Sequence, residues 1–215
     1  MEKKIIQDFY QGKVTIRPET KACLDDYKNG NCVTIALIKA ALVQFESIEG
    51  IFNSFEETAT ETHVQYRDGF DVTVNLEEID IVKNISGIKS IENTEYYKTA
   101  IKLYAIIAKR IYLQKENYND KCITSFMHAV EFLNSGYPTR IAHKLLALGK
   151  QKIRIKKIKN HKSVIIRSGA HASYCSYGIQ DIMGKTYKIR RAFGISWMKN
   201  PLGIGGVVKE AYVLE

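Results

Sequence analysis

The clearest pattern in the chain is a change of hydrophobic periodicity near residue 150. Before that point, apolar residues recur at helical spacing, and after it they alternate with polar ones. Helices are predicted at four segments, residues 32–47, 95–116, 124–134 and 138–148. The first, CVTIALIKAALVQFES, is apolar on nearly all sides, which predicts a buried helix that ends before Gly50.

Strands are predicted mainly after residue 150. The earlier segment HVQYRDGFDVTVNL has a DG turn between alternating flanks and predicts a hairpin. The later strand candidates are residues 152–158, 163–166, 172–179, 185–192, 194–198 and 207–214. A mainly helical part, 1–149, followed by a mainly β part, 150–215, predicts an α+β fold in one domain with two lobes.

Composition indicates a globular protein, with 45% hydrophobic and 26% charged residues. Cys23, Cys32, Cys122 and Cys175 form no CxxC pair, so we expect no metal site and four unpaired thiols. Unpaired thiols point to a reducing compartment. No apolar run reaches 18 residues and the first residues carry no secretory signal. We therefore expect a cytoplasmic protein without a membrane span, although delivery by another export route would leave the same pattern.

The formal net charge is +9, and seven Lys or Arg without any acid fall within residues 150–162. From Lys152 to Lys156 the cations share one face of a period-two pattern, and Ile153 and Ile155 share the other. The segment holds no interleaved aromatic residue. We interpret it as a strand with solvated basic side chains, with a nucleic-acid surface as the less favoured alternative.

Cys32 stands at the first turn of the buried helix, after the polar turn NGN. The unpaired N–H groups and the dipole at a helix start stabilise a thiolate and lower the pKa of a cysteine. The same N–H groups can stabilise an oxyanion. The alternative is a cysteine that only packs, because free cysteines are among the most buried residues.

Two further segments carry candidate partners for this thiol. His171 follows a Ser-Gly-Ala turn and opens a predicted strand, where an imidazole can act as a general base. Asn200 lies in the turn KNPLG, where an amide can hold the histidine ring in one tautomer. Cysteine on a helix, histidine opening a strand and asparagine in a turn, in this order, fit a Cys-His-Asn hydrolase.

These segments resemble the calpain-type catalytic domain of papain-like cysteine peptidases. GNCVTIALIKAAL resembles its Gly-Asp-Cys-Trp motif, AHASYCSYGI its His-Ala-Tyr-Ser-Val motif, and KNPLG its Arg-Asn-Pro-Trp-Gly motif. The resemblance spans roughly residues 30–203. It implies a two-lobe fold, with Cys32 as nucleophile, His171 as general base and Asn200 as the residue that orients the imidazole. The implied reaction is peptide bond hydrolysis through a thioester.

The oxyanion position departs from the family pattern. The family has a Gln six residues before the cysteine, and this chain has Asp26 there. An ionised Asp26 would repel the oxyanion and raise the pKa of the thiol. Asn29 and Asn31 are the candidate replacement donors.

The aromatic positions depart as well. Val33 and Leu202 stand where the family has tryptophan, and Trp197 is the candidate to shield the His–Asn bond from water. We expect a protein or peptide substrate and no cofactor; the oligomeric state stays open. One alternative is a calpain-like fold with lost or altered activity, as an acyltransferase, deamidase or binding module. A second is a nucleic-acid-binding protein that uses residues 150–162.

Overall fold

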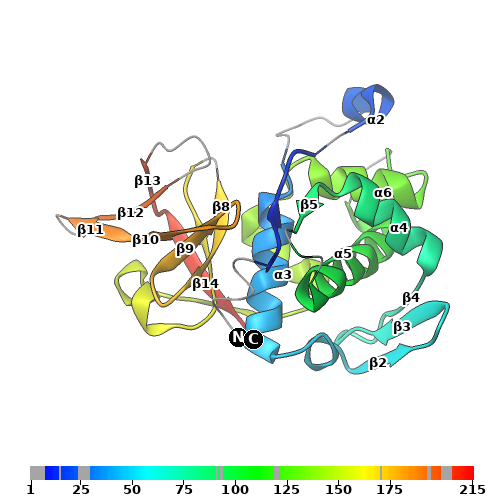
Figure 1. Cartoon of the computed structure of the whole chain (residues 1–215), viewed down its shortest axis with the longest axis horizontal. Helices are drawn as coiled ribbons and strands as arrows, with labels where there is room; N and C mark the ends of the chain where they lie inside the picture. The colour runs from blue at the N-terminus through cyan, green and yellow to red at the C-terminus, as the bar shows by residue number, and fades with distance from the viewer. Residues whose placement is uncertain are drawn as a thin grey trace.

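The computed structural model describes residues 8–14, 16–23, 30–90, 92, 94–118, 122–169, 171–192, 195–199 and 205–215, without the side chains of residues 191, 192, 199 and 205. The fold is α+β, as the sequence predicts. Helices gather on one side of the molecule and most strands on the other (Figure 1). We call residues 18–146 the helical part and residues 150–214 the β part.

The helical part contains the predicted helices and several that the sequence analysis missed. Its helices are α2 (Pro18–Cys23), α3 (Cys32–Phe45), η1 (Glu49–Ile51), α4 (Leu76–Ile85), α5 (Glu95–Leu113), η2 (Lys115–Tyr118), α6 (Phe126–Asn134) and η3 (Thr139–Leu146). The predicted helix 138–148 is a 3-10 helix, and α3 ends at Phe45, where Glu46 turns left-handed at φ 68°. Asn75 and Glu78 form a capping box that starts α4.

Two small sheets accompany these helices. β2 (Ser54–Glu57), β3 (Glu61–Gln65) and β4 (Asp71–Asn75) form a three-stranded antiparallel sheet that includes the predicted hairpin. Gly69 lies in its turn at φ +82°, a conformation that favours glycine. Near the start of the chain, β1 (Tyr10–Gln11) pairs with β5 (Ile88–Lys89).

The β part is built on a six-stranded antiparallel sheet with the order β10-β9-β8-β7-β14-β6. Its strands are β6 (Lys150–Lys152), β7 (Val164–Arg167), β8 (Ala172–Ser176), β9 (Ile179–Ile182), β10 (Lys185–Lys188) and β14 (Glu210–Leu214). A second sheet holds β11 (Arg190–Ala192), β12 (Ile195–Lys199) and β13 (Gly205–Val207). The predicted strand 152–158 is wrong beyond Lys152, because the 3-10 helix η4 (Ile155–Asn160) follows.

The large sheet has a hydrophobic core on each face, which explains its continuously buried strands. On β7, Ile165 joins the main core, and Val164 and Ile166 join a second core beneath η4. On β14, Tyr212 belongs to the main core and Ala211 to the second core. Helix α3 packs on the main-core face, between the sheet and α5 (Figure 1). Its start is thereby held between the two parts.

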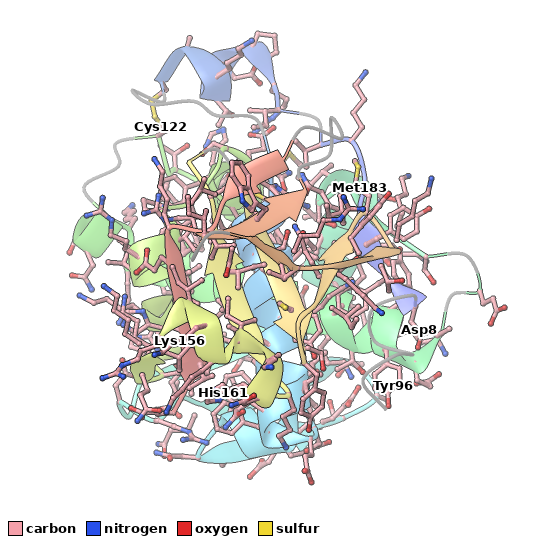
Figure 2. All side chains as sticks on the ribbon, turned by 90° about the vertical axis from the view of Figure 1, so that its left-hand side faces the viewer. Asp8, Tyr96, Cys122, Lys156, His161 and Met183 are labelled. Atoms are coloured by element: carbon pink, nitrogen blue, oxygen red, sulfur yellow. A yellow bond between two sulfur atoms is a disulfide. The ribbon has the colours of Figure 1, made fainter. Side chains whose placement is uncertain are left out.

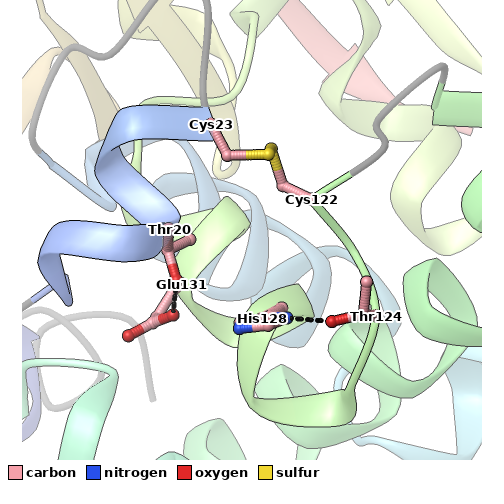
Figure 3. Close-up of a disulfide and its surroundings, with 6 residues drawn as sticks. All are labelled: Thr20, Cys23, Cys122, Thr124, His128 and Glu131. Carbon is pink, nitrogen blue, oxygen red and sulfur yellow. Dashed lines mark hydrogen bonds between the residues drawn. A yellow bond between two sulfur atoms is a disulfide. The ribbon is translucent and has the colours of Figure 1, made fainter.

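A disulfide joins Cys23, at the end of α2, to Cys122, just before α6, with the Cα atoms 5.7 Å apart (Figure 3). The expectation of four unpaired thiols is therefore wrong for this pair, and the cytoplasmic expectation loses that support. A motif search could not find the bridge, because its cysteines are 99 residues apart. Cys32 and Cys175 remain free thiols.

Candidate active site at the start of α3

Cys32 and His171 line one cavity where the helical part meets the β part. The walls come from the end of β1, the first turn of α3, the start of β8, and the end of β9 with its following turn. The full lining is Gln11, Cys32, Ile35, Ala36, His171, Ala172, Ser173, Tyr174, Asp181 and Met183. The structure thus brings two residues 139 positions apart in the sequence to one small site.

The Cys32 thiol is held by backbone N–H groups. Burial raises its pKa, while hydrogen bonds from the N–H groups of Ala172, Val33 and Cys32 itself act in the opposite direction. The sequence analysis expected a lowered pKa from the helix start. Here desolvation outweighs the N–H groups, so the isolated thiol is protonated at neutral pH.

The start of α3 keeps its backbone donors free of a side-chain cap. Asn31 precedes the helix, but its side chain makes no capping hydrogen bond. Its amide N–H donates to the carbonyl oxygen of Ser86, and Asn31 is fully buried. The side chain therefore points into the helical part and does not line the cavity, which leaves the N–H groups of the first turn to face the thiol.

His171 opens the strand that packs against the start of α3. Its carbonyl oxygen accepts from the N–H of Ser168 at 2.9 Å, which closes the turn before β8. Burial lowers the pKa of its imidazole to about 4. At neutral pH the ring is therefore neutral and can accept a proton. Within the described ranges, no side chain hydrogen-bonds the ring.

Gln11 is the cavity residue that the sequence analysis missed. It lies on β1, which the pairing with β5 and a hydrogen bond from the N–H of Gly12 to Gly87 O hold against the helical part. A Cβ at Gly30 would lie 3.3 Å from Gln11 Nε2, so this amide nitrogen sits beside the turn that leads into Cys32. Gln11 lies 21 residues before Cys32, whereas the family pattern places a glutamine six residues before the cysteine. Without that spacing, nothing in the local sequence marks Gln11 as a site residue.

A buried ion pair lies at the cavity wall, to which Asp181 contributes. Lys39 Nζ on α3 donates to Asp181 Oδ2 on β9 at 2.5 Å, with Lys39 fully buried and Asp181 7% exposed. Asp181 Oδ1 accepts from the N–H of Gly184 at 3.1 Å. Burial lowers the pKa of Lys39 and raises that of Asp181, and the opposite charge of each partner counters this.

The remaining predicted site residues are not brought to the cavity within the described part of the chain. Asp26, Asn29, Asn200 and Leu202 lie outside the described residues. Trp197, on β12, is 41% exposed and does not line the cavity. Its cross-strand neighbours are Arg190 and Val207, and neither of them lines the cavity.

Comparisons of the chain with protein-family models, with curated proteins and with solved structures returned no match. Within the described ranges, no helix is both long and apolar enough to cross a membrane. The described His, Cys, Asp and Glu residues form no group of three that could hold a metal ion.

Proposed function

We propose that the chain is a papain-like, calpain-type cysteine peptidase domain in which Cys32 is the nucleophile and His171 the general base. The observation that carries the proposal is their common cavity, in which a backbone N–H beside His171, that of Ala172, donates to the thiol. Free thiol, neutral imidazole and backbone donors at one site are the parts that thiol-dependent acyl transfer needs.

In the proposed reaction, Cys32 Sγ attacks the carbonyl carbon of a peptide bond while His171 takes the thiol proton. The oxyanion accepts hydrogen bonds from the side-chain amide of Gln11 and the backbone N–H of Cys32. The C–N bond then breaks, and the imidazolium gives its proton to the leaving amine. His171 next activates a water molecule, which attacks the thioester and releases a carboxylic acid and the free thiol. Asn200 is the proposed partner that orients the imidazole.

The two pKa shifts are compatible with this sequence of steps. Burial disfavours the thiolate of Cys32 and the imidazolium of His171 separately, so both groups start neutral at pH 7. Proton transfer between neighbours creates the two charges together, and each then stabilises the other. General-base catalysis of this kind contributes roughly 10²–10⁴-fold to a rate.

The test is alkylation of Cys32 by iodoacetamide as a function of pH, followed on its own peptide by mass spectrometry. Cys175 is an internal control, because it is fully buried and its pKa is raised to about 12 by burial. We expect the wild-type rate at Cys32 to rise above pH 4 to 5, as His171 loses its proton. The variant His171→Ala should lose this rise and react only at alkaline pH. Identical profiles for the two proteins would reject the proposal.

The alternative of altered activity predicts a different acceptor or substrate. An acyltransferase would pass the thioester acyl group to an amine, and a deamidase would release ammonia from a side-chain amide. A binding module would retain peptide without turnover. Incubation with fluorescein-labelled casein, with and without an added primary amine, separates these outcomes by product mass.

A second candidate function, binding of single-stranded RNA, is favoured by the charge of the β part. Residues 150–215 carry fourteen Lys or Arg and three Asp or Glu, whereas residues 1–149 carry eighteen and twenty. Around η4 the exposed cations are Lys152, Arg154, Lys156, Lys157 and Lys159. None of them forms an ion pair with a described residue. The positive charge is thus concentrated in the β part, and these exposed cations are available to contact phosphate groups.

The fold also adds an aromatic residue that the basic segment lacks. Tyr177 is 53% exposed, and its N–H donates to the carbonyl oxygen of His161 just after η4. A Cβ added at the next residue, Gly178, would lie 3.4 Å from the Cβ of Lys159, so this turn lies beside η4. Lys156 and His161 lie on the face shown in Figure 2. Cations beside an exposed aromatic ring are the recurring elements of single-strand binding.

Fluorescence anisotropy with a labelled oligouridine tests this second function. We expect affinity to fall with salt, and the slope to be reduced by about 0.7 for each phosphate contact removed in Lys156→Glu, Lys157→Glu and Lys159→Glu. Tyr177→Ala should weaken binding without changing the slope. The matched control, Lys83→Glu with Lys98→Glu in the helical part, should bind as wild type does. Binding without a salt slope would remove this function.

A further inference from the structure

The Lys39–Asp181 ion pair lies on, or next to, the elements that bring the candidate catalytic groups to the cavity. Lys39 lies seven residues after Cys32 on α3, two turns along the same helix. Asp181 is on β9, which pairs with β8, the strand that His171 opens. The Nζ atom of Lys39 also lies 4.8 Å from the centre of the Phe9 ring, and Phe9 precedes β1, which carries Gln11.

Residues 8–10, which lead into β1, lie near Lys39 and near the turn that follows Asp181. Asp8 adds a second negative charge near Lys39. On the other side, the turn after Asp181 contacts the same segment, because a Cβ at Gly184 would lie 3.0 Å from the Tyr10 ring. Figure 2 shows Asp8 and Met183, which belong to these two contacting segments, on the same side of the molecule. Lys39 and Asp181 therefore meet where the N-terminal segment, the cysteine helix and the β part join.

Hydrophobic packing alone does not fix how α3 is positioned against the β part and the N-terminal segment. Ile35 and Ala36 of α3, which line the cavity, offer apolar contacts that tolerate sliding along the helix. A buried ion pair is different, because two charges withdrawn from water must meet in one geometry or cost several kcal/mol. Apolar replacements of such pairs are often neutral or stabilising, so the pair is weak evidence for stability.

We infer that Lys39 and Asp181 are positioning residues, whose ion pair fixes Gln11, Cys32 and His171 relative to one another. The inference rests on the proposed function, because it assigns the pair to the geometry of that reaction. Neither residue reacts with substrate. Loss of the pair should leave a folded protein in which the thiol and the imidazole no longer cooperate.

The test variant is Lys39→Met with Asp181→Asn. Methionine fills a similar volume, and asparagine keeps the shape of the cavity wall and an oxygen for the N–H of Gly184. We expect a thermal midpoint close to that of the wild type. In the iodoacetamide experiment at Cys32, we expect the rise above pH 4 to 5 to disappear, so that the profile resembles that of His171→Ala. Hydrolysis of labelled casein should fall by about tenfold or more, because misplacement by 1 Å can cost roughly 10²-fold.

A matched control removes a comparable ion pair away from the cavity. Lys109 on α5 pairs with Glu78 on α4, with side-chain exposures of 21% and 12%. Lys109→Met with Glu78→Gln should leave the pH profile and hydrolysis unchanged. If the first double variant does not fold, Asp181→Asn alone serves in its place, because Asp8 still faces Lys39.

The outcomes separate this inference from the proposed function. A folded double variant with the wild-type pH profile would overturn the positioning role and leave the proposed function standing. A wild-type protein whose Cys32 reactivity does not depend on His171 would refute the proposed function itself. A profile lost in the double variant and kept in the Lys109 control supports the inference.

Discussion

Gln11 and Cys32 line the same cavity although they are 21 residues apart in the sequence. The segment between them includes α2, which a disulfide fastens to the chain just before α6 (Figure 3). Glu131 on α6 accepts from Nε and Nη2 of Arg17 and from the hydroxyl of Thr20. An intervening segment anchored in this way can bring a distant glutamine beside the cysteine.

Replacement of Gln11 tests its role in the oxyanion site. We expect Gln11→Ala to lower kcat by roughly 10²–10³, the usual cost of one oxyanion donor. Alkylation of Cys32 by iodoacetamide should be nearly unchanged, because no oxyanion forms in that reaction. Gln151→Ala, at an exposed position of β6, is the control. Equal hydrolysis rates for Gln11→Ala and the control would exclude the role, and a gain from Asp26→Gln would favour the position that the family spacing indicates.

The buried imidazole of His171 should make stability depend on pH. Its pKa is about 4 in the folded state and about 6.5 when unfolded, so the unfolded chain binds more protons between these values. The contribution of His171 to the free energy of unfolding is therefore complete above pH 6.5 and lost as pH falls towards 4. Urea unfolding of wild type and His171→Gln at several pH values should give a difference that changes within this window. A constant difference would show that the ring is not buried as described.

Gly184 should be less tolerant of substitution than another glycine with the same backbone conformation. Gly184 and Gly69 have φ of +79° and +82°, but an added Cβ would meet a side chain, the ring of Tyr10 at 3.0 Å, at Gly184 and nothing within 4 Å at Gly69. Gly69→Ala should cost about 1–2 kcal/mol, the price of a left-handed alanine. Gly184→Ala should cost more and also reduce hydrolysis, because Tyr10 precedes Gln11. Chemical denaturation measures the loss in the free energy of unfolding. Equal losses for Gly69→Ala and Gly184→Ala would contradict the close approach of Tyr10 to Gly184.

Removal of the disulfide should destabilise the protein. Cys23→Ser with Cys122→Ser releases a constraint across 99 residues, and we expect a loss of about 2–4 kcal/mol in the free energy of unfolding. Arg17 and Thr20 still bind Glu131, so the folded double variant should keep part of its hydrolytic activity. Glu131→Gln in the same background should lower it further. Unfolding midpoints that do not change on reduction of the wild type would contradict this expectation.

The hydrophobic pattern predicted the parts of the fold that local periodicity specifies. Helix α3 and the β3–β4 hairpin were found because a helix that is apolar on nearly all sides and a DG turn are strong local signals. The strand predicted at 152–158 failed beyond Lys152. The period-two pair Ile153 and Ile155 suggested a strand, but in η4 it is Ile155 and Ile158 that both turn inward, and residues three apart share one face of a 3-10 helix and not of a strand.

The candidate site was only partly accessible to sequence analysis. Cys32 and His171 lie beside recognisable turns, and the structure places both at one cavity. Gln11 and Asp181 reach that cavity through long-range packing, which no local spacing records. The prediction that the pKa of Cys32 is lowered was wrong for the same reason. The helix start can be recognised in the sequence, but the burial that outweighs its effect on the pKa cannot.

The disulfide means that the folded chain holds its four cysteine sulfur atoms in two oxidation states. Cys23 and Cys122 are oxidised, whereas Cys32 and Cys175 are thiols. A thiolate attacks disulfides, and a neutral thiol does so far more slowly. Because burial keeps Cys32 and Cys175 protonated, it also slows their exchange with the disulfide. The burial that makes Cys32 depend on a base thus also protects the chain from rearranging its own covalent links.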